Sequence, residues 1–177
     1  LVIYRSTLAA GATENELRPI LNNISGLKAG EEYSLAFCPE RMAEGSAYKD
    51  LTTLPVVVGG FSDACQKKIE TFWNEMGQDT VAVSSPTAAE LTKLADSWWI
   101  DLNIALANEL ALLSEQLGVD ALEVIQAANT LPKGEHNVNI LFPGSGVGGS
   151  CLVKDPWFVA DLGNAHGLNL DTPRVSR

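Results

Sequence analysis

The chain has 177 residues, of which 46% are hydrophobic and 19% charged, so it has room for one large or two small domains with an ordinary buried core. Its net charge of −10 argues against nucleic acid or an anionic membrane as a partner, because either would need a basic surface. The three cysteines are far apart and form neither a disulfide framework nor a zinc-ligand cluster, and no apolar run is long enough to span a bilayer. We therefore expect a cytoplasmic protein without a bound metal.

The first half of the chain alternates strand-like and helix-like segments. Strands are predicted at residues 1–6, 33–38, 55–59 and 80–84, helices at 13–25 and 62–76, and a polar loop at 39–50. This alternation predicts an α/β fold with a parallel sheet covered by helices. Because the chain opens directly on a strand, without an initiator Met, we expect it to be a piece of a longer protein.

The second half of the chain is predicted to be all-α. Apolar residues recur at steps of three and four from Leu91 to Leu117, which indicates one helix over residues 87–117, about eight turns and roughly 45 Å long. Further helices are predicted at 120–129 and 155–167, with an irregular segment at 130–150. We therefore expect two domains, an α/β one over residues 1–85 and a helical one over residues 86–177.

Two features concern the helices themselves. The pattern Thr-x-x-Glu occurs at Thr13–Glu16 and at Thr87–Glu90, and we interpret both as capping boxes that open helices. The long helix also has a wide apolar stripe, including the adjacent Trp98 and Trp99. We expect residues 87–117 to bury this surplus surface in a homodimer; the alternative is that a missing part of the chain covers it.

A glycine-rich loop delivers a cysteine, Cys151, to the region just before a predicted helix. Glycines allow backbone N–H groups to approach a ligand, and a thiol near a helix N-terminus with Lys154 nearby has a stabilised thiolate. The alternative is a buried structural cysteine, which is what most free cysteines are. Cys38 and Cys65 lack such surroundings and are interpreted as structural. Cys151 is therefore the candidate nucleophile of an enzyme.

The same loop contains a literal G-x-G-x-x-G in Gly144, Gly146 and Gly149. In a dinucleotide-binding fingerprint the helix begins within the glycines. Here Pro156 favours a helix start several residues later, and the preceding residues 138–142 make a poor buried strand. We therefore do not interpret this motif as the dinucleotide site.

Other candidate residues follow from their positions. Lys93 lies near the start of the long helix, and Ser97 and Asp101 continue a polar stripe at helical spacing. Glu40 and its neighbours, and likewise Ser6-Thr7, follow the carboxyl ends of predicted strands, where parallel sheets bind ligands. Solvated side chains or local turns are the alternative interpretation of each.

Several motifs in the same order resemble the UDP-glucose/GDP-mannose dehydrogenase family, and the likeness covers essentially the whole chain. They are Ser6-Thr7, residues 39–45 (PERMAEG), residues 89–94 (AELTKL), residues 103–109 (NIALANE), Gly148 to Cys151, and Lys154-Asp155. The resemblance implies that the chain holds the C-terminal part of a Rossmann-like NAD-binding domain and a helical domain that dimerises through its long helix. The NAD glycine fingerprint and a C-terminal nucleotide-binding domain are absent from the chain.

The resemblance also implies the reaction, in which a sugar C6 alcohol is oxidised to a carboxylate with NAD as the cofactor. Cys151 would add to the intermediate aldehyde, and the resulting thiohemiacetal would become a thioester that water hydrolyses. Lys93 would stabilise the oxyanion, Asp155 would position or deprotonate a water acting as base, and Glu40 would orient the hydrolytic water. The NAD contacts would come from Ser6, Thr7 and Lys154, and the sugar-nucleotide contacts from Arg41, Glu44, Ser97, Gly148 and Gly149.

The chain departs from the family pattern at two places. Ser97 stands where the family usually has asparagine, and Lys133, His136 and Asn137 stand near the position of an arginine that reaches a neighbouring subunit's ligand. The substrate signals are mixed. Residues 39–41, 146–149 and 155–158 look like the N-acetylhexosamine branch, and Ser150 and Lys154 look like the UDP-glucose branch. We expect a UDP-N-acetylhexosamine.

Two other functions stay open at this point. The β-hydroxyacid and 6-phosphogluconate dehydrogenases also place a catalytic lysine on a helix after a Rossmann domain, but they perform a single oxidation and need no nucleophile. The chain is alternatively a non-catalytic dimerisation module. Because the parts that bind cofactor and nucleotide are missing, we expect the isolated 177 residues to turn over no substrate.

Overall fold

The computed structural model describes residues 1–43, 45–131 and 139–176. The chain divides into two compact units, Leu1–Ala95 and Asp96–Arg177, and the long helix α4 (Pro86–Leu117) belongs to both. The expected helix over residues 87–117 is thus confirmed. The domain boundary at residue 85 stays a prediction, and the division between the units falls later, inside α4.

The first unit contains a four-stranded sheet in the order β1-β2-β3-β4. Its strands are β1 (Val2–Tyr4), β2 (Leu35–Phe37), β3 (Val56–Gly60) and β4 (Thr80–Val83). The pairs β1/β2 and β3/β4 are parallel, but β2 pairs with β3 antiparallel, with Ala36 opposite Gly60. The prediction of a parallel sheet is therefore wrong for the central pair of strands, β2 and β3. Parallel neighbours need a crossover element packed on the sheet, and the β2–β3 connection contains only α2 (Ala47–Thr53), which buries no residue.

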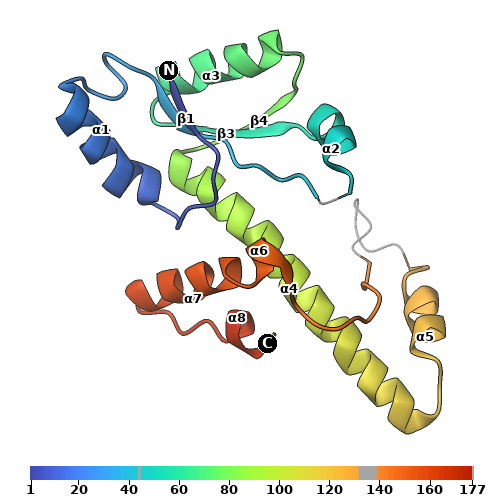
Figure 1. The fold of residues 1–177 in the computed structure, drawn as a ribbon. Helices are drawn as coiled ribbons and strands as arrows, with labels where there is room; N and C mark the ends of the chain where they lie inside the picture. The colour runs from blue at the N-terminus through green and yellow to red at the C-terminus, as the bar shows by residue number, and fades with distance from the viewer. Residues whose placement is uncertain (44, 132–138, 177) are drawn as a thin grey trace. The chain divides into compact units, whose positions relative to one another are not determined.

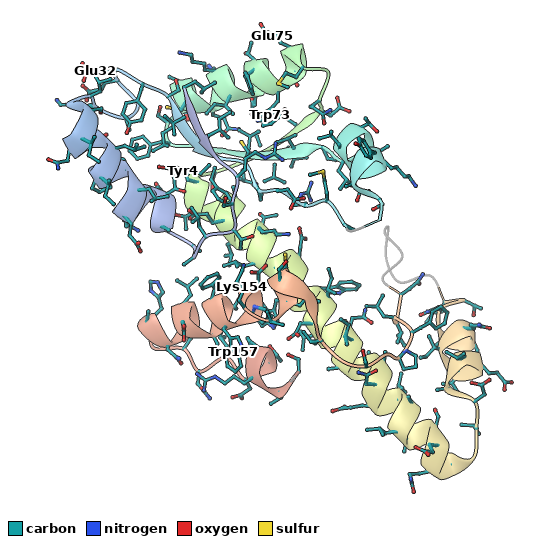
Figure 2. All side chains as sticks on the ribbon, viewed as in Figure 1. Tyr4, Glu32, Trp73, Glu75, Lys154 and Trp157 are labelled. Carbon is teal, nitrogen blue, oxygen red and sulfur yellow. The ribbon has the colours of Figure 1, made fainter. Side chains whose placement is uncertain are left out.

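Helices cover both faces of this sheet (Figure 1). The helix α3 (Asp63–Glu75) packs on one face, where Ile69 and Trp73 meet alternate strand residues such as Val56 and Val58. Figure 2 shows Trp73 pointing from α3 toward the sheet. On the other face Phe37 and Val57 meet Ala89, in the first turns of α4. Neighbouring residues along a strand therefore pack into cores on opposite faces of the sheet, because successive side chains of a strand point to opposite faces.

The remaining helical segment of the first unit begins as a π-helical turn, η1 (Thr13–Leu17), and continues as α1 (Arg18–Ser25). The predicted helices at 13–25 and 62–76 are confirmed in position. The loop predicted at 39–50 is wrong in part, because α2 begins at Ala47. Ser62 caps α3 by accepting a hydrogen bond from the Cys65 N–H.

In its described residues, the second unit comprises the rest of α4 and four further helices. These are α5 (Ala121–Ala128), α6 (Gly149–Leu152), α7 (Asp155–Ala165) and α8 (Thr172–Val175). The predicted helices at 120–129 and 155–167 are confirmed, whereas α6 and α8 are not predicted by any periodicity. No helix in the described part of the chain has the length and apolar character needed to cross a membrane.

Three asparagines hold the segment that leads into the glycine loop. Asn103 on α4 donates to the Asn139 carbonyl and accepts from the Leu141 N–H, at 2.9 and 2.8 Å. Asn129, at the end of α5, bonds both backbone groups of Ile140, and Asn108 accepts from the Gly144 N–H. A side-chain amide offers one donor and one acceptor side, so it can pair with an extended backbone as a neighbouring strand does.

Candidate functional site

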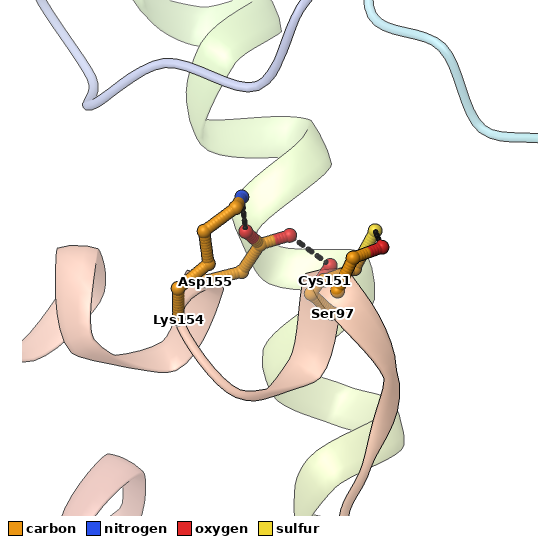
Figure 3. A network of polar contacts seen from close by, with 5 residues as sticks. Ser97, Cys151, Lys154 and Asp155 are labelled. Atoms are coloured by element: carbon orange, nitrogen blue, oxygen red, sulfur yellow. Dashed lines mark hydrogen bonds and ion pairs between the residues drawn. The ribbon is translucent and has the colours of Figure 1, made fainter.

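A buried carboxylate forms the centre of the candidate site in the second unit. Asp155, the first residue of α7, is fully buried, and its Oδ2 accepts a hydrogen bond of 2.9 Å from the Ser97 hydroxyl on α4. The Lys154 ammonium lies 2.5 Å from Oδ1 and donates to it. Figure 3 shows this network, in which each oxygen of the carboxylate faces one donor. A buried carboxylate with a cation and a hydroxyl on it is held in one orientation.

The three cysteines differ in exposure. Cys38 and Cys65 are buried, and Cys151 is exposed. Burial raises the pKa of the Cys38 thiol to about 11, which keeps that thiol protonated at neutral pH. Cys151 lies in the short helix α6, four residues before Asp155, and its sulfur is 3.8 Å from the Ser150 hydroxyl. Among the three cysteines, Cys151 alone is exposed and lies beside a glycine loop, which are the surroundings expected for a nucleophile.

The glycines of the loop have different roles in the backbone. Gly146 and Gly149 have φ angles of +104° and +79°, in the left-handed region that favours glycine. Gly148 is extended, at φ −151°, and a Cβ there would meet no atom within 4 Å. The protein's own packing thus gives no reason for glycine at position 148. A ligand that approaches the backbone closely would give one.

The other expected site residues that the structure describes lie in the first unit. Ser6 and Thr7 follow β1, and neither hydroxyl has a hydrogen-bond partner among the described residues, so both are available to a ligand. Arg41 donates to the Pro55 carbonyl at 2.7 Å, and Glu40 accepts from the Met42 N–H. Lys93 is half-buried on α4. Glu44, Lys133, His136 and Asn137 lie outside the described residues.

The structure thus joins Ser97, Lys154 and Asp155 in one network, with Cys151 nearby in sequence. Two residues of the polar stripe expected on the long helix, Ser97 and Asp101, are buried, and each makes a hydrogen bond to a residue near the C-terminal end of the chain. The Asp101 carboxylate accepts a hydrogen bond of 2.5 Å from the Ser176 hydroxyl. A groove of about 380 Å³ lies beside the glycine loop in the same unit. It is lined by Ile104, Ala105, Asn108, Glu109, Gly146, Val147, Val175 and Ser176.

The two predicted capping boxes are wrong, because Glu90 accepts hydrogen bonds from Gly11 and Thr13 instead of capping its own helix. Thr13 donates through its N–H and its hydroxyl to Glu90, not to Glu16. Thr87 lies inside α4 and donates to Glu14. Each threonine is therefore bonded to an acid more than 70 residues away, and the partner of Thr87 is Glu14, not the predicted capping acid Glu16. Both patterns were visible in the sequence, but nothing local showed these distant partners.

Two family models together match most of the chain. Residues 1–77 match the model of the NAD binding domain, and residues 87–176 that of the central domain, of the UDP-glucose/GDP-mannose dehydrogenase family. The chain belongs to this family. The resemblance stated from the motifs is thereby confirmed, as is the expectation of NAD as the cofactor of the matched domain. The available hydroxyls of Ser6 and Thr7, at the carboxyl end of β1, fit a ligand of that chemistry.

Several relatives are similar over almost the whole chain. A UDP-N-acetyl-D-mannosamine dehydrogenase from Pyrococcus horikoshii is 40% identical over 93% of this chain, and an NDP-N-acetyl-D-galactosaminuronic acid dehydrogenase from Ralstonia solanacearum is 35% identical over 91%. The solved structure of a UDP-D-ManNAc dehydrogenase from Pyrococcus horikoshii superposes with a TM-score of 0.88 and 36% identity, over 99% of this chain and 40% of that one. The chain spans 38% of the length of both curated relatives.

Proposed function

We propose that the protein containing this chain oxidises the C6 alcohol of a nucleotide sugar to the uronic acid, with NAD⁺ as the hydride acceptor. The observation that carries the proposal is the buried Asp155, oriented by Ser97 and Lys154, with the exposed Cys151 four residues before it in a glycine loop. This combination offers a fixed carboxylate and an accessible nucleophile, which a two-step oxidation of an alcohol requires.

The proposed chemistry balances with one water and two NAD⁺ per sugar. Asp155 receives the hydroxyl proton, directly or through a water, as the first hydride leaves the C6 carbon. The Cys151 sulfur then adds to the aldehyde, and its proton is released; the thiohemiacetal loses the second hydride and becomes a thioester. Water cleaves the carbon–sulfur bond and regenerates the thiol. An aldehyde has no carbinol hydride until a nucleophile adds to it, so the second oxidation depends on Cys151.

The remaining roles are proposed from the family resemblance. Lys93 stabilises the oxyanion, and Glu40 orients the hydrolytic water. Ser6, Thr7 and Lys154 contact the cofactor, and the sugar nucleotide contacts are made by Arg41, Glu44, Ser97, Gly148 and Gly149. The ion pair with Asp155 gives Lys154 a further role, because the contact helps to hold the carboxylate in one orientation. Ser97 donates directly to Asp155, which supports a positioning role for the hydroxyl that replaces the usual asparagine.

For the substrate we propose a UDP-N-acetylhexosamine. The relatives from Pyrococcus horikoshii and Ralstonia solanacearum are named for N-acetylated sugar nucleotides, and both are at least 35% identical to this chain. We further propose a homodimer through α4, whose outer surface exposes Leu106, Leu113 and Leu117. Location in the cytoplasm stays a prediction.

The experiment that tests this function counts NADH formed per sugar consumed. A full-length protein containing this chain would be incubated with NAD⁺ and a panel of UDP-hexoses and UDP-N-acetylhexosamines. We expect two NADH per sugar for the substrate, and a stalled or abolished reaction with Cys151→Ser. The matched control is Ser150→Ala, which changes the exposed neighbour and leaves the thiol in place.

The outcomes separate the alternatives. One NADH per sugar, unaffected by Cys151→Ser, would overturn the thioester route and favour a single-oxidation dehydrogenase. No NADH from any sugar, with a folded dimer, would favour a non-catalytic dimerisation module. The isolated 177 residues are expected to form no NADH, and turnover by them would contradict that expectation.

A further inference from the structure

Glu90 is a fully buried carboxylate that none of the proposed catalytic steps uses. Its Oε2 accepts a hydrogen bond of 2.6 Å from the Gly11 N–H, and its Oε1 accepts from the N–H and the hydroxyl of Thr13, at 2.8 and 2.6 Å. No lysine or arginine in the described part of the chain pairs with it. Burial accordingly raises the pKa of Glu90, although the bonds from Thr13 and Gly11 lower it. A buried carboxylate held only by neutral donors stabilises a fold poorly, so its presence calls for another explanation.

The three donors lie at the end of one particular loop. Residues 5–12 connect β1 to η1, and they carry Ser6 and Thr7. Gly11 has a φ of +95°, in the left-handed region, and this turn lets the N–H groups of Gly11 and Thr13 meet one carboxylate. Both oxygens of Glu90 therefore hold the far end of the loop, and the near end is held by the sheet through β1.

The acceptor lies on α4, three residues before Lys93. Residues three apart on a helix are neighbours on its surface, so the backbone that carries Glu90 also fixes where Lys93 begins. Loop, carboxylate and lysine all belong to the first unit. The buried Glu90 side chain thus connects the loop that carries Ser6 and Thr7 with α4, which carries Lys93.

We propose that Glu90 is a positioning residue for the dehydrogenase reaction: its carboxylate anchors the loop of residues 5–12 to α4, and so holds Ser6 and Thr7 in fixed register with Lys93. This inference rests on the proposed function for its catalytic consequence. Glu90 touches neither substrate nor cofactor and acts through the Gly11 and Thr13 amides.

The chain contains a matched control. Glu14 accepts from the N–H and hydroxyl of Thr87, and this contact also ties η1 to α4 through an acid. It is only partly buried, however, and its carboxylate makes no hydrogen bond to a described residue of the loop. A Glu14→Gln change therefore removes a comparable carboxylate between the same two elements without freeing the loop.

The test uses a full-length protein containing this chain, with two readouts that do not depend on turnover. The first is hydrogen–deuterium exchange of residues 6–13 in the protein without cofactor, and the second is the Kd of NADH measured by its fluorescence. Glu90→Gln keeps the shape but turns an amide N–H₂ toward a backbone N–H. We expect faster exchange of residues 6–13 and NADH binding weaker by about tenfold, the effect of one lost hydrogen bond to a charged group. Affinity for the UDP-sugar is expected to stay unchanged.

Glu14→Gln is expected to change neither readout, and Glu90→Asp, which keeps the charge, should recover part of the NADH affinity. If Glu90→Gln does not fold, Thr13→Val serves instead, because it removes one of the three donors and keeps the β-branched shape. Equal exchange and equal NADH affinity in the Glu90 and Glu14 variants would overturn the inference. Failure of the wild type to bind NADH would instead count against the proposed function, while the exchange readout would still test the anchoring of the loop.

Discussion

At the scale of single residues, burial decides which side chains of this chain are accessible to react. Cys38, Cys65 and Cys151 have the same side chain, yet two are inaccessible and the third is exposed in a glycine loop. Asp155 and Glu90 are both buried carboxylates, but only Asp155 has a cation on it. The surroundings of a side chain, more than its type, therefore separate the proposed catalytic groups from structural ones.

We predict that a thiol reagent modifies one cysteine per folded chain. Cys151 should react with a disulfide reagent near neutral pH, and Cys38 and Cys65 should react only after denaturation, because reagents do not reach buried sulfur. Titration of released thiolate, with mass spectrometry of the labelled peptide, checks this. Rapid native labelling of all three cysteines would show that the sheet core is open in solution.

A second prediction concerns alkaline pH. The pKa of Cys38 is about 11 in the folded chain, raised by burial from an ordinary value near 9. A raised pKa contributes stability that is present below the unfolded value and is lost as pH rises through the folded one, so unfolding free energy should fall between pH 9 and 11. The loss from this group is about 3 kcal/mol. Urea unfolding at several pH values should show a shallower decline in Cys38→Ala than in the wild type, and parallel declines would contradict the prediction.

At the scale of elements, close approach of the backbone decides where glycine is required. A Cβ on Gly59 would lie 2.2 Å from the Ser85 carbonyl oxygen, at the contact between β3 and the start of α4. Gly148 is extended, and no neighbour lies near its Cβ position. Packing within the chain therefore requires glycine at position 59 and gives no reason for glycine at position 148.

We predict that Gly59→Ala changes the stability of the fold, whereas Gly148→Ala changes the binding of the sugar nucleotide. Gly59→Ala should destabilise the fold by roughly 3 kcal/mol or more, because the sheet and α4 must separate to admit the methyl group. Gly148→Ala should change stability by less than about 0.5 kcal/mol, yet raise the KM of the sugar nucleotide if the ligand approaches that backbone. Thermal unfolding and steady-state kinetics of both variants check this. Unaltered KM in Gly148→Ala would remove Gly148 from the binding site.

Local patterns predicted the elements that are long and periodic. The apolar repeat that ends at Leu117 identified α4, and strand-like runs located all four strands. The helices α2, α6 and α8 have seven residues or fewer, too short to display a repeat. The capping interpretation failed because the partners of Thr13 and Thr87 are distant in sequence. The family was thus visible in the motifs, but the bonds around Asp155 and Glu90 depend on tertiary packing.

At the scale of the whole molecule, the exposed leucines of α4 bear on assembly. Leu106, Leu113 and Leu117 are between 46% and 67% exposed, which leaves a substantial apolar surface without cover in a single chain. We predict that Leu113→Glu with Leu117→Glu converts a full-length dimer to monomers, as measured by light scattering at several concentrations. Glu115→Ala, on the same stretch, is the control. A dimer that survives the double change would place the interface elsewhere.

Because α4 runs through both units, its first turns belong to the core of the sheet unit. Ala89 covers one face of the sheet and Glu90 closes the loop after β1, and both lie beyond residue 85, where a boundary drawn from domain character would fall. A fragment cut there would lack part of its own core. A version of the sheet unit that keeps its whole core therefore extends to near residue 95 and includes about three turns of α4. A sheet unit transferred to another protein would have to carry these turns with it.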